Sequence, residues 1–177
     1  MDAFSKSKTP EGSRDLWETP PDVFDAIQSE LGIRFSLDVC AVGENAKCFS
    51  YLSPDDDALS IDWNDRMGER YATIALWMNP PYSDPTPWVR KAAEESAKGL
   101  IVVGLVIHDP STKWFQQYVE GVASVAYVPD RRISFLQDGK PVNGNPKPSI
   151  FPVWTPWRTR QTQYVRFNLP GKKTRAA

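Results

Sequence analysis

The stretch that organises this chain is YATIALWMNPPYS, residues 71–83, in which two prolines end an apolar run. The run 71–76 has the composition of a buried strand. Proline has no backbone N–H for a sheet ladder, and Pro80 restricts the preceding Asn79 to an extended conformation. The sequence therefore predicts a stiff loop at the carboxyl end of a strand, where open α/β sheets bind their ligands.

This predicted loop carries groups suited to a planar nitrogen. The side-chain oxygen of Asn79 and the backbone carbonyl of Pro80 are two hydrogen-bond acceptors. An exocyclic amine such as adenine N6 offers two N–H donors, and acceptors that hold both would localise its lone pair for attack. The ring of Tyr82 offers a flat face for a flipped base. The alternative is an ordinary turn, because Asn-Pro-Pro is also common at strand ends.

Segments along most of the chain resemble, in order and spacing, the phage-type DNA N6-adenine methyltransferase family. The tetrapeptide NPPY, residues 79–82, resembles the catalytic motif of S-adenosylmethionine-dependent methyltransferases that act on amino nitrogens. The resemblance covers residues 14–155. The other matching segments are WETPP at 17–21, LDVCA at 37–41, ENAKC at 44–48, Asp62-Trp63 and RISF at 132–135.

The resemblance implies methyl transfer from S-adenosylmethionine to the N6 amine of adenine in double-stranded DNA, with the base flipped out. It implies no metal ion. The catalytic residues that it implies are Asn79, Pro80, Pro81 and Tyr82. The cofactor-binding residues that we expect are Trp17, Thr19, Pro20, Asp38, Ala41, Asn45, Asp62, Trp63 and Asn79.

Several of these residues also have a purely structural interpretation. Thr19 is a good N-cap for a helix that begins in the following prolines. Asp38 is suited to capping the end of the first predicted strand, and Asp62-Trp63 could be a surface carboxylate beside a core indole. No Gly-x-Gly follows Asp38, which keeps open a non-catalytic DNA-binding protein of this fold. A methyltransferase for another planar nitrogen, in RNA guanine or protein glutamine, is a further alternative.

The periodicities predict a Rossmann-like α/β domain over residues 14–169, with a mostly parallel sheet and an antiparallel closing strand. Residues 1–13 are expected to be a flexible arm and residues 170–177 a basic flexible tail. Residues 137–149 are expected to be a flexible loop. Helices are expected within 20–32, 87–99 and 113–119, and strands within 34–41, 48–52, 71–76, 100–107, 122–128, 149–154 and 163–167.

Charge is distributed unevenly along the chain. Residues 1–88 contain 7 Lys/Arg and 16 Asp/Glu, whereas residues 89–177 contain 14 Lys/Arg and 6 Asp/Glu. An acidic half suits a cationic ligand such as a sulfonium, and a basic half suits a polyanion. The alternative is a mixed, solvated surface. The residues that we expect to contact DNA are Ser83, Arg131, Arg132, Lys140, Lys147 and Arg158, with Arg160 as a further backbone contact.

The remaining composition narrows the class of protein. The two cysteines, Cys40 and Cys48, give no disulfide framework and no metal-site spacing, and the single His108 argues against a His/Cys metal site. No apolar run is long enough to span a membrane, and no apolar signal core opens the chain. The sequence therefore predicts a cytoplasmic protein of a bacterial host cell, compatible with a phage gene.

Overall fold

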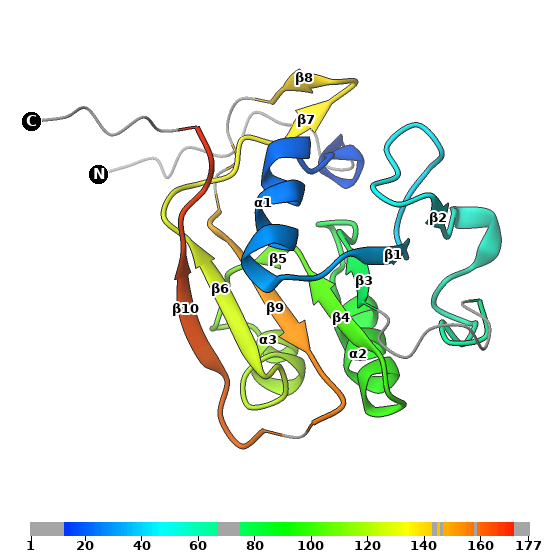
Figure 1. The fold of residues 1–177 in the computed structure, drawn as a ribbon, viewed down its shortest axis with the longest axis vertical. Helices are drawn as coiled ribbons and strands as arrows, with labels where there is room; N and C mark the ends of the chain where they lie inside the picture. Colours follow the sequence, from blue (N-terminus) through cyan, green and yellow to red (C-terminus); the bar gives the residue numbers. More distant parts are fainter. Residues whose placement is uncertain (1–12, 67–74, 143–144, 146, 158, 172–177) are drawn as a thin grey trace, which may run out of the picture.

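The computed structural model describes residues 13–66, 75–142, 145, 147–157 and 159–171. These residues form an α/β fold around one mixed sheet in the order β10-β6-β9-β4-β3-β1-β2, with β5 pairing β9 (Figure 1). The strands are β1 (Phe35–Asp38), β2 (Ser50–Tyr51), β3 (Ala75–Met78), β4 (Ile101–Gly104), β5 (Val106–Ile107), β6 (Val125–Pro129), β9 (Ser149–Trp154) and β10 (Gln163–Phe167).

The predicted fold class is confirmed, but the antiparallel strand does not close the sheet. β9 runs antiparallel to β4 on one side and to β6 on the other, so it lies inside the sheet. All six of its residues are buried, as an interior strand requires. The strand that closes this edge is β10, which is parallel to β6. Interior position and strand direction depend on partners, which the residues of β9 do not reveal.

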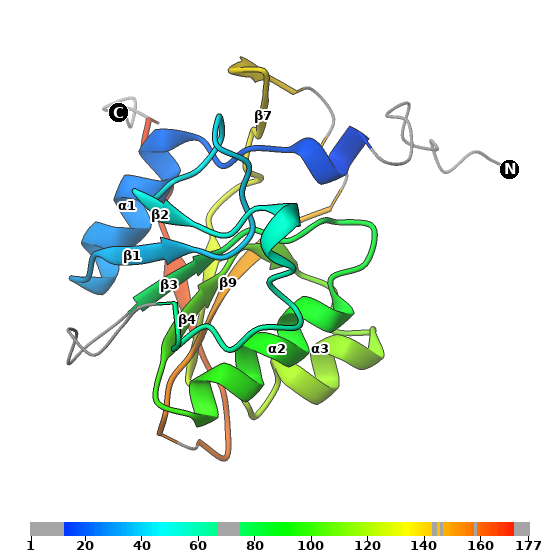
Figure 2. The same cartoon turned by 90° about the vertical axis from the view of Figure 1, so that its right-hand side faces the viewer.

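Helices cover both faces of the sheet (Figure 2). α1 (Pro21–Leu31) packs on one face, and α2 (Thr86–Ala97) and α3 (Lys113–Tyr118) lie on the other. The side chains of β3 alternate between the two faces of the sheet. Trp77 packs with Phe24 of α1 on one face, and Met78 packs in the cluster that contains Val89 of α2 on the other. Short 3₁₀ turns, η1 (Ser13–Leu16) and η2 (Pro54–Asp56), precede α1 and follow β2.

The start of α1 differs from the prediction, whereas its end agrees with it. The N-cap is Pro20 and the first helical residue is Pro21, so Thr19 lies one residue before the cap. The helix ends at Gly32, which adopts φ 64° and donates its N–H to the last turn. Thr19 is thereby left free of the capping role, and its side chain is buried.

The chain changes direction between β1 and β3. After β1 it moves outward to β2, then returns across β1 to form β3 on the other side. Asp38 pairs with Trp77, so the carboxyl ends of β1 and β3 are adjacent. Such a switch in strand order opens a crevice for ligands at this edge of a sheet. The loops that follow Asp38 and Met78 therefore lie side by side.

A β-hairpin stands where the sequence predicted a flexible loop. β7 (Leu136–Gln137) pairs with β8 (Lys140–Pro141) through a two-residue turn. Asp138 and Gly139 both have positive φ, 51° and 69°, as a type I′ turn requires. The prediction was wrong here because strands of two residues show no periodicity, although Asp-Gly is itself a hairpin signal. Glu18 and Leu136 exchange backbone hydrogen bonds of 2.8 and 3.0 Å, which join the hairpin to the segment before α1.

Candidate active site

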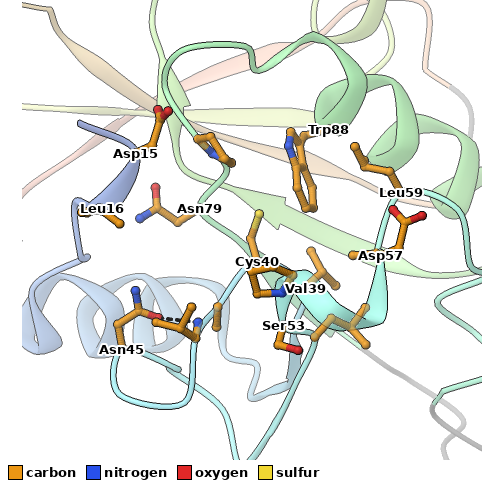
Figure 3. A pocket seen from close by; sticks show the side chains of 16 residues that line it. Asp15, Leu16, Val39, Cys40, Asn45, Ser53, Asp57, Leu59, Asn79 and Trp88 are labelled. Carbon is orange, nitrogen blue, oxygen red and sulfur yellow. Dashed lines mark hydrogen bonds between the residues drawn. The ribbon is translucent and has the colours of Figure 1, made fainter. Parts of the chain in front are cut away.

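A cavity of about 340 Å³ opens at the carboxyl ends of β1 and β3 (Figure 3). Apolar side chains form much of its wall, among them Val39, Leu52, Ala58, Leu59 and Trp88. This combination of apolar walls and a few polar groups is typical of a small-molecule site. The polar side chains that line it are Asp15, Asn45, Ser53, Asp57 and Asn79.

Asn79 lines this cavity directly after β3, and its amide is held in one orientation. The Nδ2 group donates a hydrogen bond of 3.0 Å to the backbone carbonyl of Trp17. The Oδ1 atom is buried and has no hydrogen-bond partner among the described residues. An unpaired buried acceptor costs about 1–3 kcal/mol. The geometry therefore offers a fixed acceptor to a ligand that carries an N–H or O–H.

A second, smaller cavity of about 30 Å³ adjoins the first and shares Asp15, Cys40, Asn45 and Asn79 with it. Two further polar atoms at this place, Trp17 Nε1 and Thr19 Oγ1, are buried without a partner in the described part of the chain. Three of the residues that line this small space thus carry an unsatisfied polar atom: a donor on Trp17, a hydroxyl on Thr19 and an acceptor on Asn79. Buried polar groups are nearly always paired, so this convergence marks a place for a polar ligand group.

Asp38 is the buried carboxylate at the end of β1, and it holds the loop that follows. Its Oδ1 accepts from the N–H of Cys40 at 3.2 Å, and its Oδ2 accepts from the N–H of Lys47 at 2.9 Å. Burial raises the pKa of Asp38 to about 6, against the lowering effect of these two bonds. Asp38 also lines the small cavity. Asp38 therefore both caps the end of β1 and lines the small cavity.

The loop after Asp38 keeps its shape without a Gly-x-Gly. Asn45 accepts the N–H of Val42 on its Oδ1 at 2.9 Å, which closes the turn from within. Ala41 is buried and donates its N–H to Leu52 at 3.1 Å. Both residues line the large cavity. The side-chain acceptors of Asp38 and Asn45 thus hold this turn without the glycines of a Gly-x-Gly.

Asp15, which the sequence analysis did not select, joins the N-terminal segment to the loop after β3. Its Oδ1 accepts from the N–H of Ser83 at 2.9 Å, and its Oδ2 accepts from the hydroxyl of Ser83 at 2.7 Å. Asp15 lines both cavities. Segment 15–17 therefore forms hydrogen bonds to the Asn79 loop at two places, at Ser83 and at the amide of Asn79. Asp15 and Ser83 are 68 residues apart in the sequence, so no local pattern could reveal this pair.

The Tyr82 ring belongs to an aromatic wall with Trp17 and Phe135. Its centroid lies 5.8 Å from that of Trp17 and 5.5 Å from that of Phe135. Burial raises the pKa of the Tyr82 hydroxyl well above its ordinary value. Pro80 is buried, and no described donor reaches its carbonyl. The loop after β3 therefore keeps two acceptors, from Asn79 and Pro80, beside an aromatic surface.

Asp62 and Trp63 do not lie at the cavity. Trp63 is fully buried, donates its Nε1–H to Ala58 at 2.7 Å and lies beneath the ammonium of Lys91 from α2. Asp62 pairs with Lys98 at 2.7 Å. The structure thus agrees with the structural interpretation of this pair, in which a core indole lies beside a surface carboxylate. The turn that Trp63 anchors instead presents Asp57 and Leu59 to the cavity, two residues that the sequence analysis missed.

Comparison with known proteins agrees with this arrangement. Residues 6–175 match the family described as DNA N-6-adenine-methyltransferase (Dam).

The chain belongs to this DNA N-6-adenine-methyltransferase family.

The family's relatives cover the chain almost from end to end. The chain is 35% identical to the DNA N-6-adenine-methyltransferase of Haemophilus phage HP1 over 176 residues, which span 96% of this chain and 97% of that protein. It is 28% identical to the enzyme of the same name from Escherichia phage T1, over 92% of this chain and 73% of that protein. No solved structure matches the chain.

Membership in the DNA N-6-adenine-methyltransferase family decides between the functional alternatives. The reaction is methylation of adenine N6 in DNA, rather than of RNA guanine or protein glutamine, and the chain is an enzyme rather than only a binding protein. The missing Gly-x-Gly after Asp38 therefore does not exclude the chain from the family. None of the helices in the described residues is long and apolar enough to cross a membrane.

The basic residues expected to bind the family's DNA substrate fall into three groups. Arg131 is engaged within the fold, since it pairs with Asp130 and donates to the carbonyls of Leu169 and Pro170. Arg158 lies outside the described residues, and its neighbour Arg160 is in the connection from β9 to β10, at the opposite edge of the sheet from Asn79. The exposed cations of the set are Arg132, Lys140 and Lys147, of which Arg132 donates to the Asn145 carbonyl at 3.2 Å and Lys147 pairs with Asp109 at 3.2 Å.

Proposed function

We propose that this chain methylates adenine N6 in double-stranded DNA with S-adenosylmethionine as the methyl donor, and that Asn79 holds the reacting amine. The single observation that carries the assignment of Asn79 is its buried Oδ1, which has no partner among the described residues. Its Nδ2 is tied to Trp17, so the acceptor has one direction only. A fixed, unsatisfied acceptor at a cavity edge is what a reacting N–H needs.

The residues of the large cavity fit the proposed methyl donor. Asp15 and Asp57 place carboxylates at the cavity, which suits a sulfonium cation. The apolar wall that includes Leu59 and Trp88 suits a nucleobase ring. Thr19 and the Trp17 indole offer hydrogen-bonding groups in the small cavity, suited to the polar end of an amino acid. Bound S-adenosylmethionine supplies a methyl group on a positively charged sulfur.

The chemistry asked of the protein is orientation and charge stabilisation. Asn79 Oδ1 and the Pro80 carbonyl would accept the two N6 hydrogens, which makes the nitrogen lone pair available in a fixed direction. As the new N–C bond forms, the bond from the methyl group to sulfur would break and leave a neutral thioether. The positive charge would pass to N6, where both acceptors stabilise it. The surplus proton of the methylated amine then passes to water. This scheme requires no strongly basic side chain.

The DNA must present its adenine outside the double helix for this geometry to form. Flipping costs a few kcal/mol in lost stacking and pairing. We infer that Tyr82, the partly exposed ring of the cluster that it forms with Trp17 and Phe135, borders the flipped base. Arg132 and Lys147 would neutralise phosphates near the Asn79 edge. Ser83 would act indirectly, since its hydroxyl is bonded to Asp15.

The experiment is nucleoside mass spectrometry on plasmid DNA from a host that lacks adenine methylation. The host would express the native chain, Asn79→Ala, or the exposed control Asn64→Ala. We expect N6-methyladenine with the native chain and with Asn64→Ala, and none above background with Asn79→Ala. Calorimetric titration with S-adenosylmethionine checks that each protein is folded. Methylation by a folded Asn79→Ala protein would remove Asn79 from the reaction, and no cofactor binding by the native chain would contradict the assigned donor.

A further inference from the structure

The hairpin formed by β7 and β8, residues 136–141, stands out at the top of the molecule in both views (Figures 1 and 2). It follows β6 at the carboxyl end of the sheet, the same edge that carries Asn79. Residues 138–141 are all exposed. The mechanism described above uses none of the side chains at the hairpin tip.

The base of the hairpin is fixed to the active site. Phe135, directly before β7, is 1% exposed and stacks on Trp17 with ring centroids 5.4 Å apart. It also meets the edge of Tyr82. The N–H of Val142, directly after β8, donates to the carbonyl of Phe135 at 2.8 Å. The hairpin and the aromatic wall beside the target base are therefore one rigid unit, so a flipped adenine fixes where the hairpin meets the DNA.

The tip of the hairpin carries groups suited to base edges. Gln137 and Lys140 are a cross-strand pair, so their side chains share one face of the ribbon. Asp138 occupies the turn between them. No hydrogen bond or ion pair with another described residue engages these three side chains. Glutamine pairs with adenine, lysine with guanine O6 and N7, and aspartate with the cytosine amine, and a two-stranded ribbon fits the major groove.

The charges favour base contacts over phosphate contacts. A surface that binds only phosphates gathers cations, as Arg132 and Lys147 do below the hairpin. The tip instead has one acidic and one basic side chain beside a neutral amide. Asp138 would be repelled by a phosphate, whereas it can accept from an exposed base amine.

We propose that the hairpin lies in the major groove beside the flipped adenine and reads neighbouring base pairs through Gln137 and Lys140. This inference rests on the proposed function and adds the source of its sequence preference. The chain has no separate recognition domain within the described residues, and the hairpin supplies a small reading surface in its place.

The test compares the native chain with Gln137→Ala, Lys140→Ala and the control Arg34→Ala, an exposed cation directly before β1, at the amino ends of the parallel strands. Each is expressed in a host without adenine methylation, and every N6-methyladenine is mapped by single-molecule sequencing. We expect each hairpin variant to lose discrimination at one flanking position, by on the order of tenfold to a hundredfold. Arg34→Ala should keep the native pattern. Preference among modified sites does not depend on how much folded protein is present.

Three results would overturn the proposal. A uniform decrease in methylation at all sites would mean that the hairpin contacts only phosphates. An unchanged pattern of methylated sites would mean that the hairpin has no part in recognition. A native chain that methylates adenine without any preference for the flanking bases would show that no sequence is recognised there. Filter-binding at several salt concentrations gives an independent check. Arg132→Ala should reduce the salt slope by about one, whereas Gln137→Ala should not change it. Absence of N6-methyladenine with the native chain would instead be a failure of the proposed function.

Discussion

The loops after β1 and β3 emerge side by side from parallel strands, yet they treat their polar groups in opposite ways. After β1, Asp38 and Asn45 direct their oxygens to backbone N–H groups of their own loop. After β3, Asn79 uses its nitrogen for support and leaves its oxygen unsatisfied. The first loop is a scaffold whose hydrogen bonds are internal. The second retains an acceptor for a ligand at a cost to stability, as functional sites commonly do.

The largest effect is expected from Asn79→Ala. The variant loses the proposed acceptor, and loss of one such preorganised group costs on the order of a hundredfold to a thousandfold in rate. Stability should change by less than about 1 kcal/mol, because the lost Trp17 bond is offset by removal of an unsatisfied oxygen. Single-turnover methylation of duplex DNA and urea denaturation measure the two effects. A methylation rate within tenfold of the native rate would show that the loop after β3 does not supply an acceptor for the reaction.

The scaffold loop should respond to substitution in stability. Asp38→Asn leaves an amide with one oxygen for two N–H donors, so either Cys40 or Lys47 loses its acceptor. We expect the free energy of unfolding to fall by about 1–3 kcal/mol at neutral pH. Urea denaturation measures it, with the exposed Asp138→Asn as the matched control. A variant as stable as the native chain would show that the loop does not depend on the carboxylate.

The difference in stability between the native chain and Asp38→Asn should change with pH in one direction. Burial raises the pKa of Asp38 to about 6 from an ordinary 3.8. The folded chain therefore holds this proton more tightly than the unfolded chain, so the contribution of Asp38 is full below about pH 4 and is lost as pH rises through about 6. The stability gap between the native chain and Asp38→Asn should narrow over that window by about 3 kcal/mol. A gap that widens with pH would mean that the two backbone bonds outweigh burial.

A smaller effect is expected where the N-terminal segment meets the Asn79 loop. Ser83→Ala removes one of two hydrogen bonds to Asp15, worth about 1 kcal/mol, and should lower kcat about fivefold. The dissociation constant of S-adenosylmethionine should stay near its native value, because the N–H of Ser83 still donates to Asp15. Ser29→Ala, whose hydroxyl bonds only within α1, is the matched control. A change in cofactor affinity without a change in kcat would assign the pair to the cavity rather than to Asn79.

The smallest effect is expected from Asn45→Ala. Its side chain closes an exposed turn through one hydrogen bond to Val42, which contributes about 0.5–1 kcal/mol. Because that turn lines the cavity, the dissociation constant of S-adenosylmethionine should rise by roughly twofold to fivefold. The rate at saturating cofactor should be unchanged. A decrease in that rate would mean that Asn45 contributes to the reaction, so that the loop after β1 is more than a scaffold.

Local pattern was enough for the elements whose neighbours in sequence are also their neighbours in space. The bounds predicted for β9 and β10 agree with the structure, as does the end of α1 at Gly32. The strand before Asn79 is also confirmed, although residues 71–74 of the predicted run lie outside the described residues. The proline pair placed Asn79 just past a strand end, because the missing N–H and the restriction of the preceding residue act within a few bonds.

Tertiary structure decided what local pattern leaves free. It placed β9 inside the sheet, turned Trp63 into the core rather than toward the cavity, and brought Asp15 to Ser83 across 68 residues. It also turned the Asn79 amide, since the carbonyl of Trp17 that holds its nitrogen is 62 residues away. The sequence by itself determined that an Asn stands in a stiff loop after a strand. Only long-range packing determined which of its two polar atoms is left for the substrate, because an amide has no preferred direction until a partner takes one end.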